Sequence, residues 1–137
     1  MKQVALLIMI LFFMSSCTTV KEATPPPTTG INNSPELNKE VTTSVGNNIT
    51  EKKITTMFYN PIRFTKFQQV LIFNGIVGNK LKIGYREFKD EMARPAFNNE
   101  VEYDLNTSKT IGYKGCQIEV IKADNESITY KVVKNFD

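Results

Sequence analysis

The residues best suited to covalent chemistry in this chain are its two cysteines, Cys17 and Cys116, because a thiolate is a strong nucleophile. The sequence contains no histidine, which removes Ser–His and Cys–His nucleophile pairs and the commonest zinc ligand. The carboxylates of Asp90 and Glu91 are adjacent, and nothing around them indicates a pocket that would shift their ionisation. We therefore expect no catalytic residue, no metal and no cofactor, and predict that the protein is not an enzyme.

Cys17 follows a short apolar stretch at the start of the chain. Lys2 supplies one positive charge, and residues 4–14 are apolar without interruption. A helix of this length would span about 16 Å, roughly half of a ~30 Å hydrocarbon core. The stretch is therefore too short for a stable membrane span and is typical of a secretory signal.

The end of this stretch, Met14-Ser15-Ser16-Cys17, resembles the lipobox of bacterial lipoproteins: an apolar residue, two small residues and a cysteine. The resemblance covers about the first 20 residues, and Met14 departs from the commoner leucine. It implies signal cleavage between Ser16 and Cys17, a diacylglycerol on the Cys17 thiol and acylation of the new N-terminus. The alternative is an ordinary signal with a coincidental cysteine, but the charged, apolar and small-residue regions all agree with the lipobox.

The resemblance implies a lipid-anchored protein of the bacterial cell envelope, held to the bilayer through acylated Cys17. Thr18 follows the cysteine in place of the aspartate of lipoproteins retained at the inner membrane, which favours the outer membrane, facing the periplasm, if the cell has two membranes. The chain carries 17 basic and 14 acidic residues. This balance is typical of neither a nucleic-acid binder nor a polybasic membrane binder.

Composition divides the chain into three parts. Residues 1–16 are the predicted signal, and residues 17–50 are rich in Pro, Thr and Asn without an aromatic residue. The second part buries too little to offset its ordering entropy, so we expect a flexible tether after the lipidated residue. Residues 51–137 hold the aromatic residues of the mature chain and alternate in polarity, which predicts a small β domain.

Two hairpins are expected in the β domain. The first turns at Gly78-Asn79, and the second turns at residues 124–126. Cys116 should be a small buried hydrophobe on the second hairpin, with a reactive thiol as the alternative. Further strands are expected at residues 98–105 and 55–64, the latter interrupted by Pro61. The expected pairs are Ile76–Leu81, Ile72–Tyr85 and Phe73–Gly84 in the first hairpin, and Val120–Tyr130, Ile118–Val132 and Glu119–Lys131 in the second.

Five to six short strands without a long helix predict an all-β fold, a small antiparallel barrel or sandwich that is partly open. Its most charged and aromatic stretch is residues 84–97, and Pro95 should hold Arg94 extended. Arginine and tyrosine are enriched in binding hot spots. The alternative is a solvated connection with internal Arg–carboxylate pairs and a helical turn from Phe88 to Met92. The candidate partner-binding residues are Tyr85, Arg86, Arg94 and Phe97.

Three functions remain open. The first is a non-catalytic lipoprotein module that binds an envelope protein or helps an assembly to dock. The second is a peptidoglycan or small-ligand binding module similar to SH3-like barrels, a resemblance of fold alone. The third is an inhibitor of a lytic enzyme, which needs no more than a presented loop. None of the three includes a nucleic-acid partner.

Overall fold

The computed structural model describes residues 23–137, so the signal, Ser16 and Cys17 lie outside the described residues. Within that range the chain forms ten strands and one short 3-10 helix. The all-β prediction is confirmed. The elements are β1 (Thr28–Ser34), β2 (Glu40–Ser44), β3 (Asn48–Tyr59), β4 (Ile62–Val77), β5 (Lys80–Lys89), β6 (Met92–Ala93), η1 (Pro95–Phe97), β7 (Asn99–Asp104), β8 (Thr110–Tyr113), β9 (Cys116–Ala123) and β10 (Ser127–Lys134).

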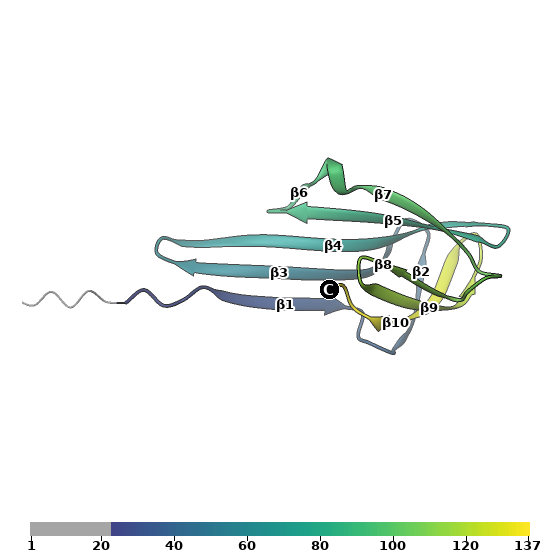
Figure 1. Ribbon diagram of the computed structural model, residues 1–137, viewed down its shortest axis with the longest axis horizontal. Helices are drawn as coiled ribbons and strands as arrows, with labels where there is room; N and C mark the ends of the chain where they lie inside the picture. Colours follow the sequence, from purple (N-terminus) through teal and green to yellow (C-terminus); the bar gives the residue numbers. More distant parts are fainter. Residues whose placement is uncertain (1–22) are drawn as a thin grey trace, which may run out of the picture.

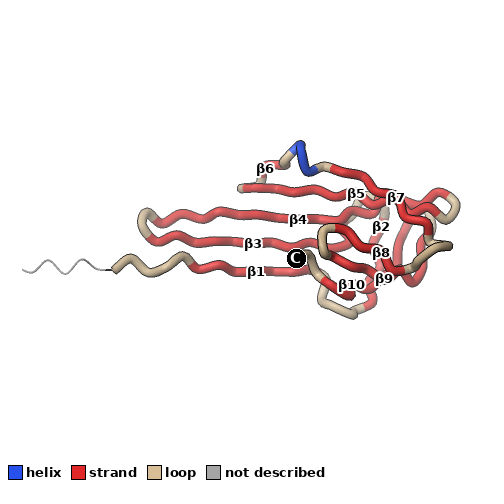
Figure 2. Tube along the Cα trace, viewed as in Figure 1, coloured by secondary structure: helices blue, strands red, loops and turns tan. Residues whose placement is uncertain are grey.

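The strands form two open antiparallel sheets. The first has the order β1-β3-β4-β5-β6, with β7 also paired to β5, and the second has the order β2-β10-β9-β8. The second sheet lies against one end of the first, as Figures 1 and 2 show. The fold is therefore an open sandwich at that end and a bare sheet at the other.

The hydrophobic core lies where the two sheets face each other. Alternation places every second side chain of each strand on the inner face, where burial of apolar surface stabilises the fold. The first sheet supplies Phe73 and Tyr85, the second supplies Tyr130, and Phe136 closes the side of the core. The core residues include Leu71, Phe73, Leu81, Ile83, Tyr85, Ile111, Ile118, Val120, Ile128, Tyr130, Val132 and Phe136.

The uncovered end of the first sheet projects from the core, and we call it the arm. It consists of residues 28–31 of β1, 53–68 of the β3–β4 hairpin and 88–93 of β5 and β6. Figure 1 shows this part extending away from the second sheet, with the β3–β4 turn at its far end. Several large apolar side chains of the arm are exposed, including Ile31, Ile62, Phe64 and Met92.

The first predicted hairpin exists, but its register is right only next to the turn. Ile76 pairs with Leu81 as expected, and a bulge at Asn74 then shifts every later pair by one residue. Phe73 was expected over the bare backbone of Gly84. The amide of Asn74 takes that place, with its Nδ2 atom 3.0 Å from where a Cβ of Gly84 would stand. The observed pairs are Leu71–Tyr85, Ile72–Gly84 and Phe73–Ile83.

The second hairpin has the predicted register, with Val120 opposite Tyr130 and Ile118 opposite Val132. Glu119 lies opposite Lys131, as expected. Cys116 is buried at 1% exposure, which confirms the interpretation of its side chain as a core residue. The register was predictable here because both strands bury alternate residues in one core.

Residues 28–50, predicted to belong to a flexible tether, instead form β1, β2 and the start of β3. The strand count was too low for the same reason. β1 buries almost no side chain, and its pairing from Thr28–Met57 to Ser34–Glu51 shows that main-chain hydrogen bonds to β3 hold it. The single strand expected at residues 55–64 is wrong. These residues are the end of β3, a turn that contains Pro61 and the start of β4.

Candidate functional site

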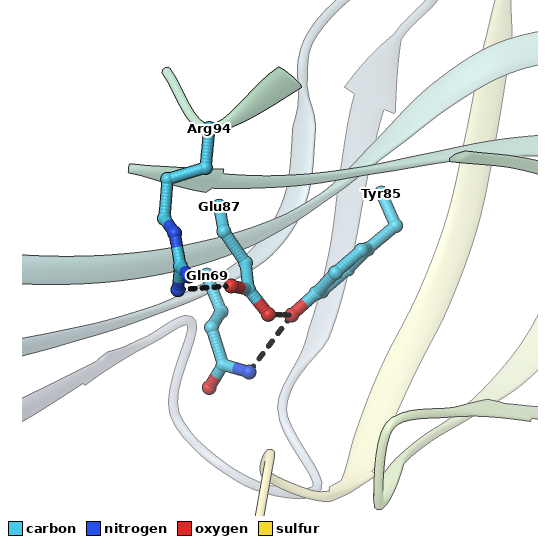
Figure 3. A network of polar contacts seen from close by, with 4 residues as sticks. All are labelled: Gln69, Tyr85, Glu87 and Arg94. Atoms are coloured by element: carbon cyan, nitrogen blue, oxygen red, sulfur yellow. Dashed lines mark hydrogen bonds and ion pairs between the residues drawn. The ribbon is translucent and has the colours of Figure 1, made fainter. Parts of the chain in front are cut away.

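Tyr85 is an internal residue and cannot contact a partner as predicted, because its side chain has 0% exposure. Its hydroxyl donates a hydrogen bond of 2.5 Å to Glu87 and accepts one of 2.8 Å from the Gln69 amide. Figure 3 shows the three side chains converging beneath Arg94. Burial, followed by the hydrogen bond to Glu87, raises the pKa of the Tyr85 hydroxyl, so it stays a proton donor.

Glu87 is a buried carboxylate with 6% exposure, held by two donors. The first donor is the Tyr85 hydroxyl. The second is the Arg94 guanidinium, which forms an ion pair with Glu87 Oε2 at 3.1 Å. A buried charge is costly unless it is paired and hydrogen-bonded, and these contacts meet both conditions. Arg94 therefore makes an internal ion pair, as in the alternative of internal Arg–carboxylate pairs, while part of its side chain stays exposed.

Arg94 and Phe97 lie together, as their candidate roles require. The backbone of Arg94 is extended, with φ −97° and ψ 102°, as expected before Pro95. The 3-10 turn from Pro95 then brings the Phe97 ring under the guanidinium, with 4.2 Å between Arg94 Cζ and the ring centroid. This contact holds the planar face of Arg94, which keeps 41% of its side chain exposed.

No helical turn joins Phe88 to Met92, contrary to one alternative. Asp90 and Glu91 form a tight turn with φ values of 51° and 70°, and Met92 then pairs back on Lys89. Two consecutive positive φ values are typical of the type I′ hairpin turn. Lys66 holds this turn, since its backbone nitrogen donates to Asp90 Oδ1 at 2.8 Å.

Arg86 stands apart from the other candidates. It is exposed and pairs with Val70, whereas its neighbour Glu87 pairs with Gln69. Successive side chains of a strand point to opposite faces, so Arg86 and Arg94 belong to opposite faces of the first sheet. The four candidate residues therefore do not form one surface. Only Arg94 and Phe97 are brought together.

A groove of about 520 Å³ adjoins Arg94 and Phe97 at the edge of the arm. Met92, Ala93 and Pro95 give it an apolar lining, and Lys89 and Asp90 add charge at its rim. Met92 is 73% exposed. A groove of this kind can take an apolar side chain of a partner, with a polar group placed against Arg94.

The opposite face of the arm has a second groove, of about 420 Å³, between Lys53 and Phe88. Two ion pairs border it: Lys66–Glu91 at 2.5 Å, which is exposed, and Lys53–Glu51 at 2.9 Å, in which Glu51 is partly buried. Exposed pairs of this kind contribute little to stability. The exposed apolar residues Ile62 and Phe64 of the arm were missed as candidates, although their alternation around Arg63 in "PIRF" was a visible signal.

Two further observations concern groups that could carry chemistry. Burial raises the pKa of the Cys116 thiol to about 12, which keeps the thiol protonated and unreactive at neutral pH. Among residues 23–137, no three His, Cys, Asp or Glu side chains are grouped so that they could hold a metal ion. In the same range, no helix is long and apolar enough to cross a membrane.

The structure identifies the protein by its fold, which is an open all-β sandwich with a projecting sheet. No family model, no curated protein and no solved structure matches the chain.

Proposed function

We propose that this protein is a lipoprotein of the bacterial cell envelope whose β domain is a non-catalytic binding or assembly module. The lipobox-type sequence that ends at Cys17 supports the anchor, with the outer membrane favoured by Thr18. The observation that carries the binding role is the apolar groove beside Arg94, where an arginine is already oriented and an exposed methionine is available.

The partner that fits this groove is an envelope protein that presents an extended segment with an apolar side chain. Phe97 and Met92 offer the apolar contacts, and the exposed part of the Arg94 guanidinium offers donors to a carboxylate or carbonyl group. The contacts with Glu87 and Phe97 already restrict the Arg94 side chain before a partner binds. Such preorganisation lowers the cost of binding.

Site-specific photocrosslinking in intact cells tests this proposal. A photoreactive amino acid at Met92 should capture one discrete envelope protein, and the same probe at Val77 should not. Val77 is a matched control because it is similarly exposed, at 69% against 73% for Met92, and lies at the other end of the first sheet. The adduct at Met92 should disappear in a Cys17→Ser variant, because the anchor brings the groove to its partner.

Other outcomes separate the remaining functions. Capture of peptidoglycan fragments at Met92 would favour the wall-binding alternative, and capture of a lytic enzyme would favour the inhibitor. Equal capture of the same proteins at Met92 and Val77 would show a non-specific surface and contradict the proposal.

A further inference from the structure

The far end of the arm carries a concentrated apolar surface, which we call the tip. It consists of residues 57–64 around the turn at Asn60 and Pro61. Ile62 is 73% exposed and Phe64 is 57% exposed. Their strand partners Tyr59 and Met57 extend the same face, because directly paired residues of an antiparallel ladder share a face.

The opposite face of the tip carries an aromatic residue and a cation. Arg63 pairs with Phe58, and its guanidinium carbon lies 4.6 Å from the centroid of the Phe58 ring. From residue 54 to residue 65 the chain has no acidic side chain, and Arg63 is its single charge. Aromatic rings with an arginine suit the headgroup region of a bilayer, where anionic phosphates attract basic side chains.

The N-terminal segment arrives at this tip. Thr28 begins β1 opposite Met57, and its hydroxyl forms a 2.7 Å hydrogen bond with the Tyr59 hydroxyl. Before β1, residues 23–25 line a shallow groove of about 270 Å³ with Tyr59 and Asn60. Figure 1 shows the chain leaving β1 at the end of the sheet where the β3–β4 turn lies.

The path of the N-terminal segment limits how far the tip can lie from the lipid anchor. Five residues lie between Cys17 and Ala23, so six residue steps join them. At about 3.3–3.6 Å per residue, they reach about 20 Å when fully extended. A bilayer that holds acylated Cys17 therefore lies close to the tip.

We propose that the tip is a membrane-contact site: Ile62, Phe64 and Tyr59 enter the interface of the bilayer that holds Cys17, and Arg63 binds anionic headgroups. The proposal rests on the lipid anchor of the proposed function. Contact at the tip would set the orientation of the domain, with the arm next to the bilayer and the core away from it. The groove beside Arg94 then lies on the flank of the arm, open to a partner.

A bilayer fits the tip better than a second protein surface does. The two most exposed apolar side chains of the tip, Ile62 and Phe64, offer about 500 Å² at most, at about 150–250 Å² each. A stable protein interface buries about 1,200–2,000 Å² in total, which is about 800 Å² on each partner. The apolar and aromatic residues also lie on both faces of the hairpin, which suits immersion in an interface better than a flat docking contact.

Tryptophan fluorescence tests the proposal directly, because the natural sequence contains no tryptophan. The lipidated full chain would carry Phe64→Trp, with Ile62→Trp as a second tip variant. Val77→Trp is the matched control on an exposed residue at the other end of β4. Each protein is reconstituted into vesicles that contain phosphatidylethanolamine and phosphatidylglycerol at about 3:1. The phosphatidylglycerol is included because the headgroup contact of Arg63 needs an anionic lipid.

The expected result is a blue shift of the tip tryptophans and their quenching by brominated acyl chains, with no quenching at position 77. Far-UV circular dichroism checks that each variant keeps its β structure. Protein that floats with the vesicles but shows no quenching at positions 62 and 64 would overturn the tip contact and leave the anchor standing. Protein that does not float would overturn the anchor, and the tip contact with it.

A photoreactive amino acid at Phe64 in cells distinguishes the other occupants. Adducts to lipid support the proposal. A discrete protein adduct, or a dimer of this chain crosslinked through position 64, would overturn it.

Discussion

The hydroxyl of Tyr85 donates a 2.5 Å hydrogen bond to the carboxylate of Glu87, two residues further along β5. The two side chains share a face of the strand because the period of a strand is two residues. Tyr85 belongs to the hydrophobic core, and Glu87 is buried beside it. The pair forms a polar edge of the core, and Arg94, which lies between β6 and η1, completes it with an ion pair to Glu87.

Tyr85→Phe should lower the free energy of unfolding by about 1.5–3 kcal/mol, because it removes a hydrogen bond to a buried carboxylate. The ring stays in place, so the core loses no volume. Urea denaturation followed by far-UV circular dichroism measures the change. Tyr59→Phe is the control, since it removes the exposed hydroxyl contact with Thr28 and should change the free energy by less than about 0.5 kcal/mol. Equal effects at the two positions would contradict this account of Glu87.

Arg94→Met should destabilise the fold by about 1–2 kcal/mol, while Arg86→Met should have almost no effect. Methionine keeps most of the apolar stem of the arginine but leaves Glu87 without its ion pair. Loss of a fully buried partner costs about 3–5 kcal/mol. Water screens this pair because 41% of the Arg94 side chain is exposed, so the expected cost is smaller.

The same denaturation assay compares the two variants. A larger loss for Arg86→Met than for Arg94→Met would contradict the placement of these residues on opposite faces of the sheet.

The sequence predicted those parts of the fold in which one face of a strand meets the core. The β9–β10 hairpin is such a case, because a shift of one residue would have placed Ile118 opposite Lys131. The β4–β5 register beyond Ile76–Leu81 was missed because the bulge at Asn74 was not anticipated, although Gly75 beside it, with a φ of 112°, is the kind of strand glycine that marks one. β1 was missed because only Asn33 among its residues is even partly buried, so no alternation marks it. Its stability comes from backbone pairing, which composition does not reveal.

The candidate site was predicted in part for a similar reason. Pro95 correctly indicated an extended Arg94, a local effect of the proline ring. The ion pair with Glu87 depends on the turn at Asp90 and Glu91, where two non-glycine residues take positive φ values. Such a turn is rarely expected without glycine or asparagine, so the partner of Arg94 could not be chosen among the neighbouring carboxylates.

Phe136→Ala should cost about 3 kcal/mol of stability, because it opens a cavity at the edge of the core. The Phe136 ring is 5% exposed and lies 6.1 Å from the Tyr85 ring between centroids. Lys52 also binds this end of the chain, donating to the backbone oxygen of Asp137 at 2.7 Å. Chemical denaturation measures the loss, and Asp137→Asn is the control.

Asp137→Asn weakens an exposed contact with Lys134, so its effect should stay below about 0.5 kcal/mol. A Phe136→Ala variant as stable as this control would show that the C-terminal residues do not belong to the core.

The stability of the protein should fall as the pH rises from about 9 towards 12, and Cys116 should account for part of the fall. Burial raises the pKa of the Cys116 thiol from 9.0 to about 12, so the unfolded chain loses this proton first. In this window the folded state binds more protons than the unfolded state, and the free energy of unfolding therefore decreases with pH. Burial also raises the pKa of Tyr130 to about 12, so the fall continues above pH 10.

Cys116→Ala separates the contribution of the thiol from that of the tyrosines. The variant should be less stable than the natural protein at pH 7, because the core loses a buried sulfur atom. Its stability should, however, fall less steeply between pH 9 and 10, because in the unfolded chain the thiol loses its proton before the tyrosines do. Urea denaturation at stepped pH values measures the slope. An unchanged slope would mean that Cys116 ionises equally well in both states. Rapid alkylation of Cys116 in the native protein at pH 8 would point the same way, because a buried, protonated thiol should react only after the chain unfolds.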